Sequence, residues 1–185
     1  MTRSEKTTGG LGFHSLGTET EAKLPVEGDL PTWLSGSLIR NGPGSFAVGD
    51  ETVDHWFDGL AMLHRFTFDG GSVRYKNRFL RTDAYDAART GEFEGGFATG
   101  NSTLRERLWN LLFADAYDNT NIIVERFGED FFALTESPRW VRLDPATLGT
   151  KGDFRYEGPE PSGRLTCAHL RYDPEREVYV NFETE

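Results

Sequence analysis

The amino-acid sequence predicts an all-β fold that carries one amphipathic helix. Two segments, residues 62–81 and 122–135, alternate apolar and polar residues on both sides of a short glycine-containing loop, which is typical of a β-hairpin. The motif Arg-x-Asp-Pro ends a short strand-like run at residues 142–145 and again at residues 171–174. Short antiparallel strands with turns at this spacing favour a β-propeller or a β-sandwich.

The N-terminal part of the chain divides into a lead-in and a first strand. Residues 1–20 are polar and have no periodicity, so we expect a flexible lead-in ahead of a β domain over residues 21–185. Residues 24–28 read as a short extended piece, and residues 38–40 read as a strand.

A glycine-rich turn is predicted directly after that strand. Gly42 and Gly44 flank Pro43, and proline fixes its own φ while glycine accepts positive φ. We therefore expect the backbone to reverse here and to direct Trp56, Phe57 and the two imidazoles of His55 and His64 inward.

The segment 62–81 gives the clearest secondary structure. His64, Phe66 and Phe68 occupy alternate positions before the loop 69–71, and the alternation resumes after it. This pattern places His64 on a strand.

One helix is predicted after a surface connection over residues 84–100. Thr103 and Glu106 form a capping box. Apolar residues follow at helical spacing, namely Leu104, Leu108, Leu111, Leu112 and Phe113. In the simplest interpretation this helix packs on the core. The remaining strands are expected at residues 122–127, 131–135, 140–143, 170–172 and 178–182.

Composition excludes some classes of function. The net charge is −10, which argues against nucleic-acid binding because phosphate contacts need a basic face. Cys167 is the only cysteine, so an internal disulfide is excluded and a reducing cytoplasm fits. No apolar run approaches the roughly 18 residues of a membrane-spanning helix. We expect a cytoplasmic protein that is soluble or at most peripheral to a membrane.

Two motifs contain several rare residue pairs, namely Pro-Thr-Trp-Leu-Ser-Gly-Ser-Leu-Ile-Arg-Asn-Gly-Pro-Gly at 31–44 and His-Trp-Phe-Asp-Gly at 55–59. They resemble the carotenoid cleavage oxygenases, the non-haem iron enzymes that include carotenoid and apocarotenoid dioxygenases and a retinoid isomerase. The resemblance implies a seven-bladed β-propeller. Seven blades of about 40–45 residues need on the order of 300 residues. We therefore expect these 185 residues to be the N-terminal portion of a longer or complemented protein.

The same resemblance implies one Fe²⁺ per complete domain, bound by four histidines. Residues 165–169, Leu-Thr-Cys-Ala-His, resemble the segment with the first of them, so His169 is the predicted metal ligand. Leu170 stands where the family often has proline. A packed core histidine is the alternative. His55 and His64 do not match the ligand positions and are expected to be structural, and His14 falls in the lead-in.

The resemblance also implies a second site residue, which is acidic. Residues 135–137, Thr-Glu-Ser, look like the family segment whose glutamate accepts the free N–H of a ligand imidazole. Glu136 is therefore predicted to support a ligand histidine, which is left unassigned. A solvated carboxylate at a strand end is the alternative. The family also commonly has an apolar membrane-contacting patch where Leu104, Leu108, Leu111, Leu112 and Phe113 lie, so membrane docking is the second interpretation of that helix.

The implied reaction is iron(II)-dependent cleavage of a conjugated double bond in a carotenoid or apocarotenoid by dioxygen. The 185-residue chain alone is expected to be inactive, since a single imidazole cannot hold ferrous iron usefully. Two alternatives remain open. A related stilbene-cleaving dioxygenase or an isomerase would share every motif, and a non-catalytic remnant that binds a carotenoid or a partner would show no iron uptake.

Overall fold

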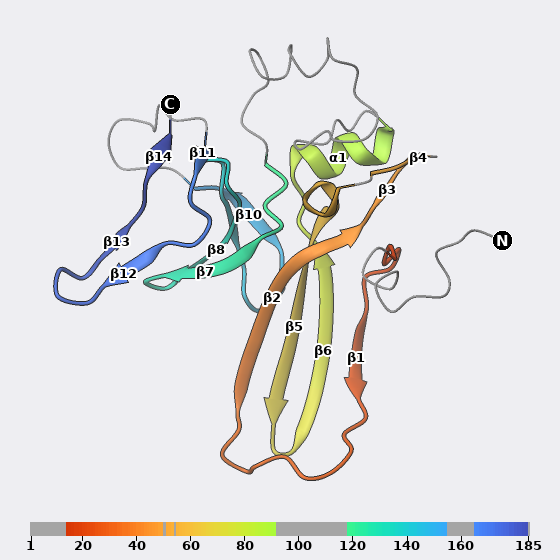
Figure 1. Cartoon of the computed structure of the whole chain (residues 1–185). Coiled ribbons are helices and arrows are strands. Elements are labelled where there is room, and N and C mark those ends of the chain that lie inside the picture. The colour runs from red at the N-terminus through yellow and green to blue at the C-terminus, as the bar shows by residue number, and fades with distance from the viewer. Residues whose placement is uncertain (1–13, 50, 54, 92–117, 155–164, 185) are drawn as a thin grey trace.

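The computed structural model of the chain describes residues 14–49, 51–53, 55–91, 118–154 and 165–184. Within these ranges the fold is mostly β, as predicted. The strands form two four-stranded sheets and three two-stranded pairs, and all the pairings are antiparallel (Figure 1). No sheet within these ranges closes on itself.

The first sheet has the strand order β1-β6-β5-β2. Its strands are β1 (Glu21–Leu24), β2 (Gly36–Ser45), β5 (Leu60–Asp69) and β6 (Ser72–Phe79). Figure 1 shows β2, β5 and β6 as the long strands of the molecule, which extend well past the second sheet. The predicted hairpin is confirmed, with Asp69 opposite Ser72. Both glycines of its turn have positive φ, which a tight hairpin requires.

The predicted reversal at residues 42–44 is wrong, because β2 continues through it. Pro43 pairs with Ala61 and Ser45 with Leu60, and the register shifts between them as in a β-bulge. Glycine is required at position 44 because Met62 packs closely against it, and not because the chain turns there. A Cβ built on Gly44 would lie 2.5 Å from the Cβ of Met62.

Residues of the predicted lead-in 1–20 are hydrogen-bonded to the first sheet. The amide of Leu16 donates to Gly44 O (2.6 Å), and the amide of Thr20 donates to Asn77 Oδ1 (2.6 Å). Glu19 accepts from the guanidinium of Arg81 (2.6 Å). The domain thus begins to make contacts ahead of β1.

Helix α1 (Asp83–Thr90) lies in the segment for which the sequence predicted a surface connection. Thr82 caps its first turn, since its side chain accepts from Tyr85 N. Gly91 ends the helix in the left-handed conformation. The helix buries Tyr85 and Ala88 in one cluster with Leu60, Met62 and Phe79. The predicted helix over Leu104–Phe113 lies outside the described residues.

The second sheet has the order β10-β9-β8-β7. Its strands are β7 (Ile123–Phe127), β8 (Asp130–Leu134), β9 (Val141–Leu143) and β10 (Thr150–Asp153). The hairpin β7–β8 confirms the second predicted hairpin. The two-stranded pairs are β3 (Ala47–Val48) with β4 (Glu51–Thr52), β11 (Leu165–Thr166) with β14 (Glu183–Thr184), and β12 (Arg171–Asp173) with β13 (Val178–Val180).

Apolar side chains from both four-stranded sheets join in one core. Ala61, Leu63 and Leu80 come from the first sheet and the residue after it, and they pack with buried residues of the second sheet and its loops, namely Ala133, Val141, Leu143 and Leu148. Burying such side chains is the main source of stability in a fold of this kind. This core holds the two sheets together.

A buried polar segment, residues 118–121, joins the sheets by hydrogen bonds. Asn119 Oδ1 accepts from Ala61 N (2.8 Å), and its amide donates to Gly59 O (2.9 Å). Asn121 also donates to Gly59 O (2.7 Å). From the other side, Asn41 donates to Thr120 O (2.5 Å). These bonds satisfy main-chain groups that would otherwise be buried without partners.

Candidate functional site

A pocket of about 690 Å³ lies where the first sheet meets the start of β7. Ligand pockets commonly fall in this size range. Most of its lining is apolar or aromatic, with a few polar side chains among them. The lining residues are Leu24, Arg40, Asn41, Gly42, Pro43, Trp56, Phe57, His64, Phe66, Tyr75, Asn121 and Ile122.

His64 and Tyr75 form a hydrogen-bonded pair in the pocket wall. The distance from His64 Nδ1 to the Tyr75 hydroxyl is 2.7 Å, and the rings are stacked. They come from paired strands, because Phe66 lies opposite Tyr75 on β5–β6. Burial, and after it the Arg40 cation, lowers the pKa of the His64 imidazole, and burial raises the pKa of the Tyr75 phenol. Both side chains are therefore held in their neutral forms near neutral pH.

Asn121 adds a polar group whose oxygen has no partner. Its amide nitrogen donates to Phe57 O (2.9 Å) and Gly59 O (2.7 Å), which fixes the orientation of the side chain. The oxygen Oδ1 is buried and accepts no hydrogen bond from the residues that the structure describes. Only 3% of Asn121 is exposed. An unpartnered buried acceptor is costly, so this position favours a ligand that can donate.

The sequence directed Trp56 and Phe57 inward, but both are partly exposed, at 40% and 37%, and they line the pocket and not the core. The sequence did not indicate that Arg40, His64, Tyr75 or Asn121 would line the same pocket. For Tyr75 a signal was present, because Phe66 and Tyr75 lie at matching positions on either side of the predicted hairpin turn. Pairing in the hairpin then puts them on one face. For Asn121 no local signal exists, since its contact with Phe57 spans 64 residues.

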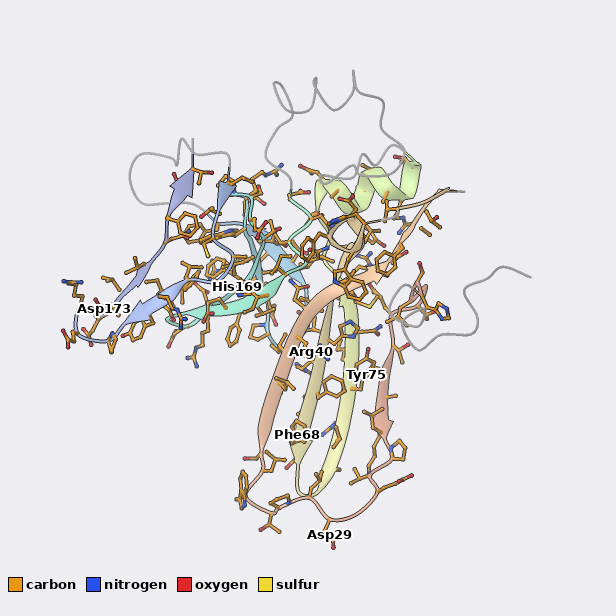
Figure 2. The ribbon with its side chains drawn as sticks, in the orientation of Figure 1. Asp29, Arg40, Phe68, Tyr75, His169 and Asp173 are labelled. Atoms are coloured by element: carbon orange, nitrogen blue, oxygen red, sulfur yellow. The ribbon has the colours of Figure 1, made fainter. Side chains whose placement is uncertain are left out.

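His169 lies in a tight turn between β11 and β12. The sulfur of Cys167 accepts from the amide of His169 and lies 3.4 Å from its carbonyl oxygen. The turn is fastened to the next strands by Asn181, which accepts from Cys167 N (3.2 Å) and donates to Thr166 Oγ1 (2.5 Å). The His169 side chain is exposed, near the beginning of β12 (Figure 2). It is thus not a packed core histidine in this structure.

Glu136 lies beside the strand that leads to His169. The amide of Thr166 donates to Glu136 O at 2.7 Å, which joins the end of β8 to β11. The Glu136 side chain is exposed. The two segments that carry the predicted site residues are therefore neighbours, although 33 positions separate Glu136 from His169 in the sequence.

A packed cluster connects the His169 turn to the pocket. Ala168, which directly precedes His169, is 2% exposed and belongs to a cluster with Leu134 and Trp140. Ile122 packs against the same cluster and also lines the pocket. This apolar cluster thus extends from the residue before His169 to one residue of the pocket wall.

The described residues supply one candidate iron ligand and not a complete set. No three histidine, cysteine, aspartate or glutamate side chains within the described ranges are grouped so as to hold a metal ion. His169 fits iron chemically, because an exposed imidazole in a fixed turn can coordinate. The remaining ligands of such a site would have to come from elsewhere.

His55 and His64 each have a hydrogen-bond partner among the described residues. His55 caps the 3₁₀ helix η2 (Trp56–Asp58), where its Nδ1 accepts from Phe57 N (3.3 Å). His14 is exposed. The predicted apolar membrane residues Leu104, Leu108, Leu111, Leu112 and Phe113 lie outside the described residues. Within the described part of the chain, no helix has the length and hydrophobicity to cross a membrane.

Solved structures define the class of this β-sheet protein. A Synechocystis apocarotenoid oxygenase variant superposes with a TM-score of 0.73 at 31% identity, covering 88% of this chain and 35% of that one. A chimera of that oxygenase with RPE65 gives 0.76 at 30% identity, covering 93% and 38%. A cobalt-substituted form of the Synechocystis oxygenase gives 0.73 at 31% identity, covering 88% and 35%. The described part of the chain therefore matches about a third of the carotenoid oxygenase fold.

Sequence comparison places the chain more narrowly. The family described as retinal pigment epithelial membrane protein (RPE65) matches residues 13–185, so the chain belongs to the RPE65/carotenoid oxygenase family. The β,β-carotene 15,15'-dioxygenase of Gallus gallus is 36% identical over 162 residues, which are 82% of this chain and 30% of that protein. The carotenoid isomerooxygenase of Drosophila melanogaster is 36% identical over 145 residues, covering 72% and 23%. The chain thus spans about a third or less of these relatives.

Proposed function

We propose that this chain is part of an iron(II)-dependent oxygenase that cleaves a conjugated double bond of a carotenoid or apocarotenoid with dioxygen. The observation that carries the proposal is the family match over residues 13–185, because it includes the pocket, Glu136 and His169 together. Relatives named as β,β-carotene 15,15'-dioxygenases supply the substrate class. The apolar pocket suits a lipophilic polyene.

In this proposal His169 is one ligand of a single Fe²⁺ ion. Iron, when bound, supplies the activation of dioxygen. The residues of this chain have two roles. The turn in which the His169 amide donates to the Cys167 sulfur holds His169 in place, and the apolar pocket wall excludes water from the polyene. Glu136 would orient a ligand imidazole by accepting its second N–H. The cobalt-substituted relative supports a metal site of this type.

The complete domain would be a seven-bladed β-propeller, to which the two four-stranded sheets contribute. Four-stranded antiparallel sheets are the usual blades of such folds. A cytoplasmic protein that touches the membrane surface through Leu104, Leu108, Leu111, Leu112 and Phe113 would have access to a lipophilic substrate.

The test is His169→Ala in the full-length protein. We expect iron content to fall well below one per chain and polyene cleavage to be lost, because removing an imidazole ligand weakens the site. Metal analysis and chromatography of the carbonyl products measure the two effects. His55→Ala is the matched control, since His55 caps η2 and should leave iron content unchanged. Full iron content and full cleavage in His169→Ala would contradict the proposal.

A second candidate function is cleavage coupled to double-bond isomerisation. It is favoured by the carotenoid isomerooxygenases of Drosophila melanogaster and Galleria mellonella, which are 36% and 37% identical to this chain. The geometry of the products discriminates the two functions. An all-trans product pair from an all-trans carotenoid indicates simple cleavage, whereas one cis product indicates the coupled reaction.

A further inference from the structure

The pocket wall carries two hydrogen-bonding positions inside an apolar surround. One is the Tyr75 hydroxyl, held by His64 at 2.7 Å, and the other is the buried oxygen of Asn121. Both residues line the pocket, together with apolar side chains such as Leu24, Phe66 and Ile122. Such a surface matches a molecule that is mostly apolar and carries one polar group.

The hydrogen-bonding capacity of these groups indicates which polar group fits. If Tyr75 donates to His64 Nδ1, its oxygen keeps lone pairs for a ligand donor, and the opposite tautomer of His64 also leaves a lone pair on that oxygen. Asn121 Oδ1 is an acceptor in either case, because its amide nitrogen is engaged with Phe57 O and Gly59 O. Acceptors are thus present in every protonation arrangement of the neutral pair. A ligand O–H satisfies them, and a hydrocarbon does not.

The electrostatics disfavour a carboxylate as the main ligand. Arg40 is the cation that faces His64 across the β2–β5 pair, but its side chain is exposed to solvent, where an ion pair is weak. Burial and Arg40 lower the pKa of the His64 imidazole, so it offers no second cation near neutral pH. Asn121 Oδ1 is an acceptor oxygen that would repel an anion, whereas the Tyr75 hydroxyl can donate only in the tautomer in which His64 Nδ1 carries the proton. Figure 2 shows Arg40 and Tyr75 on the long sheet.

We propose that the Tyr75–His64 pair and Asn121 Oδ1 bind the hydroxyl group of a hydroxylated carotenoid end group, and that Tyr75 selects hydroxylated over unsubstituted carotenoids. The pocket volume of about 690 Å³ accommodates a cyclic end group with part of its polyene. This inference rests on the proposed function for the identity of the polyene. The pocket, however, can be tested by binding alone.

The experiment compares zeaxanthin and β-carotene, which differ only in two ring hydroxyls, on the full-length iron-loaded protein. In the unchanged protein we expect zeaxanthin to have the higher kcat/KM. Tyr75→Phe removes the hydroxyl and keeps the ring. A hydrogen bond contributes about 0.5–1.5 kcal/mol, so the zeaxanthin to β-carotene ratio should fall by up to about tenfold. Tyr172→Phe is the matched control, because Tyr172 lies on β12 outside the pocket lining.

Three results would overturn the inference. One is an equal change of kcat/KM for both carotenoids in Tyr75→Phe, which indicates a packing role only. Another is an equal fall of the zeaxanthin to β-carotene ratio of kcat/KM in the control variant Tyr172→Phe. The third is tighter binding of an apocarotenoid carboxylate than of the corresponding alcohol, which would make Arg40 the determinant.

A binding measurement separates this inference from the proposed function. Without dioxygen, zeaxanthin and β-carotene binding is followed by the absorption shift of the polyene. If the protein cleaves neither carotenoid but Tyr75→Phe weakens zeaxanthin binding selectively, the proposed function fails and the hydroxyl site stands. If both carotenoids are cleaved and Tyr75→Phe leaves their ratio unchanged, the function stands and the hydroxyl site fails.

Discussion

At the scale of single residues, Gly44 shows how a glycine can be needed for proximity and not for a turn. The residue lies in β2 with Met62 of β5 against its α-carbon, and neither Gly42 nor Gly44 has a positive φ. The sequence alone shows glycine next to proline, for which a turn is the usual interpretation. Only the packing of Met62 reveals the close contact.

Gly44→Ala should therefore destabilise the protein. The added Cβ would meet Met62 Cβ at 2.5 Å and Met62 Sδ at 2.9 Å, and overpacking of this kind costs about 1–3 kcal/mol. The urea midpoint of the full-length protein is the measurement. Gly42→Ala is the matched control, since a Cβ added at Gly42 would have no neighbour within 4 Å. Equal midpoints for the two variants would show that β2 shifts without cost.

At the scale of secondary-structure elements, the two hairpins were predicted, whereas helix α1 and the short strands β3, β4, β10, β11 and β14 were missed. Each hairpin strand carries its own period-two pattern, so the hairpins β5–β6 and β7–β8 follow from local sequence. Helix α1 spans only eight residues. Thr82 and Gly91, its two ends, fit known capping preferences, but a helix this short is stabilised mainly by tertiary contacts.

One of those contacts comes from Asp118, 34 positions after Ala84. The Asp118 carboxylate accepts from the amides of Asp83 (2.8 Å) and Ala84 (3.0 Å) at the first turn of α1. Arg139 lies 3.7 Å from the same carboxylate. A negative group at a helix N-terminus satisfies free N–H groups and interacts favourably with the helix dipole. This cap is long-range, so the local sequence does not show it.

Asp118→Ala should expose the first turn of α1. Loss of a cap costs about 0.5–2 kcal/mol, and removal of a buried acceptor leaves Asp83 N and Ala84 N without partners. Hydrogen exchange of the amides in α1, measured on the full-length protein, should become faster. Asp86→Ala is the control, because Asp86 is exposed on the same helix. Unchanged protection in Asp118→Ala would mean that Thr82 alone is sufficient as a cap.

At the scale of the whole molecule, the segments that carry Glu136 and His169 are neighbours, and the pocket is formed by other residues. His169 and Glu136 came from a family resemblance, and the contact of Thr166 N with Glu136 O shows that their segments are neighbours. The pocket combines residues of β1, β2, η2, β5 and β6 with the two residues that precede β7. Its assembly depends on which sheets pack together, and no periodicity within a single strand encodes that.

The strands after residue 164 differ from the rest of the molecule in their exposure. Large apolar side chains here face solvent, with exposed fractions from 37% to 62%, namely Leu165, Tyr172, Val178, Tyr179, Val180 and Phe182. Val178 and Val180 lie on one face of β13, and exposed apolar side chains that cluster are typical of interaction surfaces. In the 185-residue chain alone, these strands form a surface suited to association.

The 185-residue chain alone should therefore self-associate through β12 and β13. Val178→Thr with Val180→Thr keeps β-branched side chains on one face of β13 while lowering their hydrophobicity. A loss of about 1.4 kcal/mol or more would weaken association at least about tenfold. Sedimentation velocity across a concentration series measures the change. Val26→Thr, at another exposed apolar position, is the control and should associate as the unchanged chain does. If the unchanged chain remains monomeric throughout the series, β12 and β13 do not mediate self-association.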